Sequence, residues 1–135
     1  MTVRRVLLVA ENDELVDGIA AWLATSPTLE VAGRAHSGAE AVDRAVRLQA
    51  HLVIVDATLP DMSGYEATRA LKSLRPAPRV LMMTFLDTRL AKLAALAAGA
   101  DGLVATPEIP QRLLPRIAEL FAPAGGLVET TQDGA

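Results

Sequence analysis

The chain has 135 residues, of which 51% are hydrophobic, and a net charge of −3. This length predicts one domain with a buried core, and the charge argues against a basic surface for nucleic acids. The absence of cysteine excludes disulfides and thiolate chemistry. No apolar run approaches the roughly 20 residues of a membrane span, and residues 6–9 are too few for a secretory signal. We therefore expect a soluble, cytoplasmic protein.

Short apolar runs alternate with segments of helical periodicity along the chain. Strands are predicted at residues 6–9, 29–35, 52–55, 80–83 and 103–105. Helices are predicted at residues 15–23, 37–50, 67–74, 87–98 and 113–121. Ser37 and Glu40 have the spacing of a capping box, Gly99 is expected to end the fourth helix, and Pro115 to kink or delay the last one.

Connections of this length between strands predict parallel strands and right-handed crossovers. The fold class is α/β: a doubly wound (βα)5, flavodoxin-like three-layer sandwich with strand order 2-1-3-4-5. In that order the chain reverses direction between the first and third strands. Glu11 and Asp56 follow these two strands, so we expect them to meet at the resulting crevice.

Asp56 is the most informative residue of the chain. It ends the buried run of residues 52–55, and Pro60 and Gly64 mark the loop that follows. Without this context an aspartate at a strand end is more often a turn residue. In an open α/β sheet, however, the carboxyl end of a buried strand is where reactive groups lie. The segment resembles the phosphoacceptor strand and loop of response-regulator receiver domains, and the resemblance covers roughly residues 3–121.

The resemblance implies a signalling protein rather than an enzyme. A sensor histidine kinase would phosphorylate Asp56, and the hydroxyl group of Thr84 would sense the phosphoryl group. Without the resemblance, Thr84 could instead be a threonine at a strand end that is packed by its methyl group. Glu11, Asp56 and the backbone carbonyl of Thr58 would hold Mg²⁺. No other cofactor is implied.

Two positions depart from the receiver pattern. Ala10 stands at the first of two acidic positions, and Thr106 stands where the family has a lysine. A charge pair at ~4 Å contributes ~4 kcal/mol at an effective dielectric near 20, whereas a hydrogen bond to a charged group contributes roughly 1.5–3 kcal/mol. Thr106 therefore cannot replace the lysine. Asn12 and Asp13 are expected to cap the first helix rather than bind metal. We predict an atypical receiver with weak or lost Mg²⁺ binding.

Further departures affect the surroundings of this site. Phe85 follows Thr84 where the family has a small residue, so its ring could cover the phosphoryl pocket. Leu103 replaces an aromatic residue that turns inward on activation in the family. Arg112 could supply the missing positive charge from the last helix. The bond between Thr106 and Pro107 is a candidate cis peptide.

Residues 1–121 are expected to form the receiver domain, and residues 122–135 a linker or tail. Receivers of the NarL/LuxR type end similarly, with a Gly-Gly before a DNA-binding domain. The implied function is transcription regulation through an output domain that this chain lacks. DNA would be bound only by that domain, and the receiver itself could form a homodimer.

Two other functions remain open. In the first, the fold is a pseudo-receiver that acts as a dimerisation or protein-interaction module without phosphorylation. In the second, the chain is a flavodoxin-like protein that binds a mononucleotide. The second is disfavoured because the loop at residues 10–14 carries three carboxylates, which repel phosphate. His36 and His51 are expected to be surface loop residues.

Overall fold

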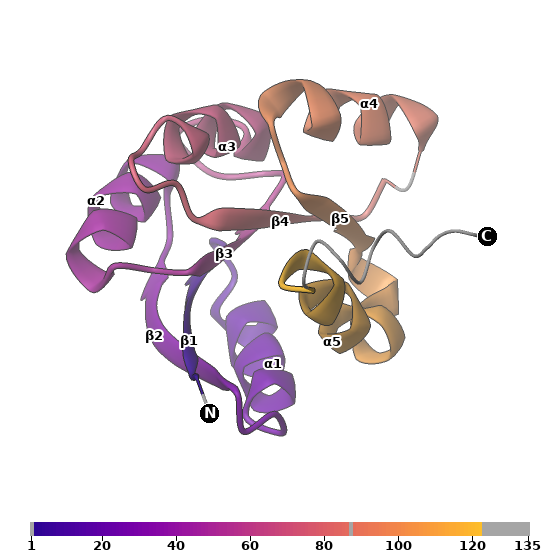
Figure 1. The fold of residues 1–135 in the computed structure, drawn as a ribbon. Helices are drawn as coiled ribbons and strands as arrows, with labels where there is room; N and C mark the ends of the chain where they lie inside the picture. Colours follow the sequence, from indigo (N-terminus) through magenta and orange to yellow (C-terminus); the bar gives the residue numbers. More distant parts are fainter. Residues whose placement is uncertain (1, 87, 123–135) are drawn as a thin grey trace.

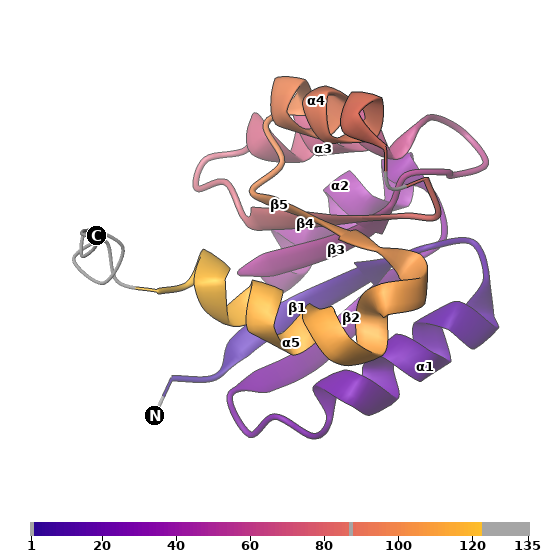
Figure 2. The same ribbon diagram turned by 90° about the vertical axis from the view of Figure 1, so that its right-hand side faces the viewer.

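The computed structural model describes residues 2–86 and 88–122 of the chain. Within them a five-stranded parallel sheet has the order β2-β1-β3-β4-β5, with helices on both faces (Figures 1 and 2). The strands are β1 (Arg4–Val9), β2 (Leu29–Ala35), β3 (Leu52–Asp56), β4 (Arg79–Thr84) and β5 (Gly102–Ala105). The helices are α1 (Asp13–Leu23), α2 (Gly38–Leu48), α3 (Gly64–Lys72), α4 (Arg89–Ala98) and α5 (Ile109–Leu120), with a 3-10 turn η1 (Thr106–Glu108) before α5. The predicted fold class and strand order are confirmed.

Each face of the sheet has its own core. Helices α1 and α5 cover one face, where Ile19 and Leu113 are buried, and α2, α3 and α4 cover the other, where Leu71 is buried (Figure 1). Successive residues of a strand contribute to opposite cores, as Leu7 and Leu8 do in β1. Burial on both faces explains why the central strands are continuous apolar runs in the sequence.

The helix starts differ in part from the prediction. The side chain of Ser37 accepts a hydrogen bond from the backbone N–H of Glu40, as expected for the start of α2. The Glu40 carboxylate, however, accepts from the backbone N–H of His36 at 2.7 Å, so the predicted capping box is only half formed. A complete capping box joins Ser63 and Glu66 at the start of α3, directly after the Asp56 loop.

Helix α4 begins at Arg89 with Thr88 as its N-cap, and Gly99 ends it at a φ of 92°. The left-handed conformation explains why glycine is used at this position. Asp87, where we expected the helix to start, lies outside the described residues. The same holds for residues 123–135, most of the expected linker.

Helix α5 begins at Ile109, earlier than predicted, and continues on both sides of Pro115, so the proline does not delay it. The expectation of a cis bond between Thr106 and Pro107 was wrong: in the described part of the chain the cis bond joins Arg75 and Pro76. Pro107 instead occupies the first turn of η1, where its fixed φ suits a helix start. None of the described helices has the length and apolar character needed to span a membrane.

Candidate functional site

The register of β1 and β3 places residues 10 and 56 at the same level of the sheet. Val9 is paired with Val55, so Ala10 and Asp56 come next at the carboxyl ends of the two strands. Glu11 follows in the loop that leads to α1, and its side chain is exposed. Glu11 and Asp56 thus lie at the same edge of the sheet, which the strand order had predicted.

The same edge continues across β4 and β5. Asp56 is paired with Met83, and Thr84 is paired with Ala105. Thr106 follows directly as the first residue of η1. Asp56, Thr84 and Thr106 are therefore brought together at the carboxyl ends of three adjacent strands. Asp56 also lies beside the topological switch point between β1 and β3, where open α/β sheets bind ligands.

The side chain of Asp56 is half-buried and forms no ion pair with any described residue. Burial raises the pKa of this carboxyl group above its ordinary value, because desolvation disfavours the charged form. The backbone N–H of Thr58 donates a hydrogen bond of 3.1 Å to Asp56 Oδ1, which partly offsets this effect. The carboxylate is thus oriented by the backbone and has no ion-pair partner among the residues that the structure describes.

The loop after Asp56 is held by backbone contacts. Thr58 and Ser63 form an isolated antiparallel bridge, and the N–H of Gly64 donates to the carbonyl oxygen of Ala57 at 2.7 Å. A Cβ atom at residue 64 would overlap the carbonyl oxygen of Asp56. Glycine is therefore required for the return of the chain against the end of β3, which accounts for its place in the sequence pattern.

Thr84 is 5% exposed, and its hydroxyl oxygen accepts a hydrogen bond of 3.0 Å from the backbone N–H of Leu86. The same hydroxyl lies 3.5 Å from the carbonyl oxygen of Leu86. It is therefore engaged with its own loop. The neighbouring Phe85 is 71% exposed, so its side chain lies largely in solvent rather than packed in the core.

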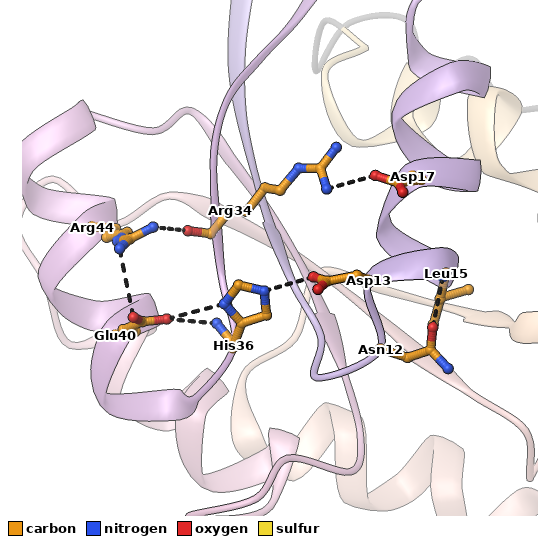
Figure 3. Close-up of polar contacts among 8 residues, drawn as sticks. All are labelled: Asn12, Asp13, Leu15, Asp17, Arg34, His36, Glu40 and Arg44. Atoms are coloured by element: carbon orange, nitrogen blue, oxygen red, sulfur yellow. Dashed lines mark hydrogen bonds and ion pairs between the residues drawn. The ribbon is translucent and has the colours of Figure 1, made fainter.

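The residues after Glu11 have other partners (Figure 3). Asn12 is the N-cap of α1, and its side chain accepts from the backbone N–H of Leu15 at 3.0 Å. Asp13 begins the helix and pairs with His36, with 2.7 Å between Oδ1 and Nε2. The expectation that Asn12 caps the helix is confirmed. The carboxylate of Asp13 contacts the ring of His36.

The role of His36 was missed in the sequence. Its ring joins Asp13 of α1 to Glu40 of α2, whose carboxylate lies 3.7 Å from Nδ1 (Figure 3). Arg34 makes a second link, to Asp17 of α1, at 2.6 Å. The contact with Glu40 could have been predicted, because Glu40 follows His36 by four residues. The contact with Asp13 could not, because Asp13 lies 23 positions away in the sequence.

Ala10 is fully buried in the core beneath α1 and α5. Of the described residues, no group of three or more histidine, aspartate or glutamate side chains is arranged to hold a metal ion. The oxygen donors available at this edge are the carboxylates of Glu11 and Asp56 and the carbonyl of Thr58. Mg²⁺ is usually held by one or two carboxylates together with waters and phosphate oxygens. The donor set therefore fits Mg²⁺, but with one carboxylate fewer than the receiver pattern.

The position of the family lysine is occupied by a nearly buried hydroxyl, since Thr106 is 9% exposed. Arg112, which was considered as a replacement cation, instead pairs with Glu108, the N-cap of its own helix, with 3.3 Å between Nε and Oε1. Leu103 is partly buried and packs against the core beneath α2, α3 and α4. No basic side chain described in the structure is paired with Asp56.

Comparison with known families agrees with this geometry. The sequence model of the response regulator receiver domain matches residues 6–118. The response regulator protein VraR of Staphylococcus aureus is 36% identical over 104 residues, which are 77% of this chain and 49% of that protein. The chain thus spans about half the length of the curated relatives that it matches.

Solved structures show the same fold. A two-component response regulator of the LuxR family from Aurantimonas sp. is 29% identical, with a TM-score of 0.82 over 88% of this chain and 86% of that one. The non-phosphorylated receiver domain of RcsB from Escherichia coli has a TM-score of 0.81 at 20% identity, covering 88% of this chain and 93% of that one. At this lower identity the likeness concerns the fold alone.

Proposed function

This chain belongs to the response regulator receiver domain family, and we propose that it is an atypical receiver in which phosphorylation of Asp56 is inefficient. The observation that carries the proposal is the composition of one sheet edge, where Asp56 lies between a fully buried Ala10 and a neutral Thr106. Residues 1–121 would form the receiver, and residues 122–135 would lead to a DNA-binding output domain. The partner would be a sensor histidine kinase in the cytoplasm.

In this proposal the free carboxylate oxygen of Asp56 attacks the phosphorus of a phosphohistidine. A P–O bond forms, the P–N bond breaks, and the released histidine nitrogen takes a proton. The N–H of Thr58 holds Oδ1, which orients the carboxylate for this attack. The Thr84 hydroxyl would have to exchange its bonds to Leu86 for one to the phosphoryl group, which would move the β4–α4 loop.

Mg²⁺, held by Glu11, Asp56 and the Thr58 carbonyl, would neutralise charge on the phosphoryl oxygens. Phosphoryl transfer depends mainly on such positioning and charge neutralisation. A phosphorylated aspartate at this edge would carry about −1.5 to −2 charges. Two groups that serve this neutralisation are absent. Residue 10 is alanine, so a carboxylate that would help to hold Mg²⁺ is missing, and residue 106 is threonine, so no lysine supplies positive charge. The phospho-form would therefore be slow to form and poorly stabilised.

The test is incubation with acetyl phosphate and Mg²⁺, followed by intact-mass measurement, with Asp56→Ala as the control. We expect labelling of a minor fraction of the wild-type protein and none of the variant. Stoichiometric labelling at ordinary Mg²⁺ concentrations would contradict the proposed weakness. Labelling that persists in Asp56→Ala would contradict the assignment of Asp56.

A second candidate function is supported by the orientation of α4. The buried residues of this helix are alanines: Ala91, Ala95 and Ala98. Its leucines face solvent, with Leu90 76% exposed and Leu93 53% exposed. An apolar face with small residues turned inward and large ones outward is typical of an interaction surface. A pseudo-receiver that dimerises or binds a protein through α4 would need no phosphoryl group.

Sedimentation of the unphosphorylated protein tests this second function. We expect a concentration-dependent dimer that is lost in the double variant Leu90→Ser, Leu93→Ser. Val46→Ser, which changes a 57% exposed residue on α2, is the matched control and should leave the dimer intact. If the wild-type protein stays monomeric and binds no partner in the absence of phosphorylation, the second function is wrong.

A further inference from the structure

A cavity of about 750 Å³ lies at the opposite edge of the sheet from Asp56, where the central strands begin. Its size is within the range of small-molecule sites. The basic residues Arg5, His51, Arg75 and Arg79 line it, and most of its other lining residues are apolar. None of the lining residues within 2–86 and 88–122 is acidic. In a chain of net charge −3, this is a concentration of positive charge around an apolar space.

Two hydrogen-bond donors face each other in this cavity. The backbone N–H of Arg5 donates to Nδ1 of His51 at 2.9 Å, so Nδ1 carries the lone pair of the ring. The hydrogen of the neutral ring is then on Nε2. Nε2 lies 3.4 Å from Nη2 of Arg5, which is also a donor. An oxyanion between these two nitrogens would accept from both.

The surroundings of His51 favour the neutral form of its ring. Burial and the neighbouring cations Arg5 and Arg4 lower the pKa of His51 below its ordinary value. The Arg5 guanidinium is fixed beside the ring, because its Nε donates to the carbonyl oxygens of Leu48 and Gln49 at 3.1 Å. The pair of donors is therefore held in place before any ligand arrives.

The other bases add positive charge with little compensation. Arg75 donates only to the carbonyl oxygens of Lys72 and Leu74, and it has no carboxylate partner within residues 2–86 and 88–122. Arg79 is 3.5 Å from a carboxylate oxygen of Asp101. One apolar wall is the ring of Phe121 at the end of α5.

We propose that this cavity binds a small amphipathic anion, with one carboxylate or phosphate group on an apolar body. The oxyanion would lie between Arg5 Nη2 and His51 Nε2, and the apolar body would fill the space lined by Val46, Leu74 and Phe121. The site is independent of Asp56, since the two lie at opposite edges of the sheet. Binding would place a ligand against the end of α5, where residues 122–135 begin.

The test is titration of the ¹⁵N-labelled protein, followed by NMR of backbone amides and of the His51 ring. Octanoate and octyl phosphate are the probes and distinguish the two head groups. Octanol supplies the apolar body without charge, and acetate supplies the charge without the body. We expect saturable shifts at Arg5, His51 and Phe121 with one of the two probes, and at least tenfold weaker binding of octanol and acetate.

The variant His51→Asn is the sharpest perturbation. Its side-chain oxygen can still accept from the Arg5 N–H, while the Nε2–H donor is removed. We expect octanoate or octyl phosphate to bind about tenfold more weakly, as for the loss of one hydrogen bond to a charged group. Arg75→Gln should also weaken binding. Arg69→Gln, which removes an exposed charge of α3 outside the cavity, is the matched control.

Three results would overturn the inference. The first is the absence of saturable shifts with both amphipathic probes. The second is equal binding of octanol, which would make the cavity an apolar space without anion preference. The third is an affinity of a correctly folded His51→Asn variant equal to that of the wild-type protein.

Discussion

Gly64 lies against the carbonyl group of Asp56 so closely that any side chain at residue 64 would overlap it. The contact is between backbone atoms, and a Cβ would also lie 2.7 Å from Cα of Ala57. Neither neighbour can move away without displacing the end of β3. The position of Asp56, the candidate phosphoacceptor, therefore depends on the close approach of Gly64, the first residue of α3.

We expect Gly64→Ala to lower the free energy of unfolding by about 1–3 kcal/mol, as overpacking does in a close-packed site. Urea denaturation measures this change. Gly18→Ala is the control, because nothing lies within 4 Å of an added Cβ there and the residue is in the interior of α1. The control should be stabilising by up to about 1 kcal/mol, since alanine favours helix. Equal effects of the two substitutions would contradict the close approach.

The pH dependence of stability tests the environment of Asp56. Burial raises the pKa of this carboxyl group, so the folded state holds the proton more tightly than the unfolded state. Its contribution to stability is present below the ordinary aspartate pKa and is lost as the pH rises through the folded-state pKa. Asp56→Asn should therefore be more stable than the wild-type protein at pH 7.

Thermal unfolding at a series of pH values checks this expectation. The difference between Asp56→Asn and the wild-type protein should shrink as the pH falls below the ordinary aspartate range, because both side chains are then neutral. Asparagine keeps an oxygen for the Thr58 N–H, so the backbone contact is preserved. A difference that grows on acidification would mean that the carboxylate is stabilised by a cation.

The strand order and the location of the candidate site could be predicted because they depend on local patterns. Continuous apolar runs marked the buried strands, their alternation with helices indicated parallel strands, and the order was that of a flavodoxin-like doubly wound sheet. Together these placed Asp56, Thr84 and Thr106 at one edge. The helix caps Asn12 and Gly99 were also predicted correctly, because each residue type favours a helix end whatever its distant neighbours are.

Features that depend on distant partners could not be read from the sequence. His51 accepts from the backbone of Arg5, a contact across 46 residues that no local pattern reveals. The inward face of α4 was also ambiguous. Alanine and leucine are both apolar and both follow helical spacing in this segment, so periodicity alone does not show that Ala95 is buried while Leu93 is exposed.

Restoring the two altered positions should restore metal-dependent chemistry. Ala10→Asp places a carboxylate at a fully buried position, which costs stability unless a cation binds beside it. We expect Ala10→Asp to be destabilised by about 1–3 kcal/mol without Mg²⁺ and to recover part of this loss when Mg²⁺ is added. The wild-type protein should show a much smaller Mg²⁺-dependent shift in melting temperature.

The double variant Ala10→Asp, Thr106→Lys extends this test to phosphorylation. It should be labelled by acetyl phosphate several-fold faster than the wild-type protein, because both missing charges are supplied. Thr106→Lys alone is the matched comparison for charge without the added metal ligand. If the double variant folds and binds Mg²⁺ but is labelled no faster, the low reactivity has another cause than these two positions.

Asp101, directly before β5, links α3 to β4 at the amino-terminal end of the strands. Its Oδ2 lies 2.8 Å from the Lys72 ammonium and accepts from the backbone N–H of Val80 at 2.8 Å, and its side chain is 19% exposed. Asp101→Ala would leave a partly buried ammonium group and an N–H without this partner. We expect a loss of about 1–3 kcal/mol in the free energy of unfolding.

The control for this prediction is Asp43→Ala, which removes an ion pair with Arg47 on the surface of α2. The side chains of Asp43 and Arg47 are 58% and 75% exposed. Exposed pairs of this kind contribute about 0.5 kcal/mol or less, and salt screens them. Urea denaturation at low and high salt compares the two. The Asp101 effect should persist in salt because the N–H of Val80 loses its acceptor at any ionic strength. If Asp101→Ala lowered the free energy of unfolding as little as Asp43→Ala does, the contacts of Asp101 would contribute no more than an exposed ion pair. In that case α3 and β4 would be joined by packing alone.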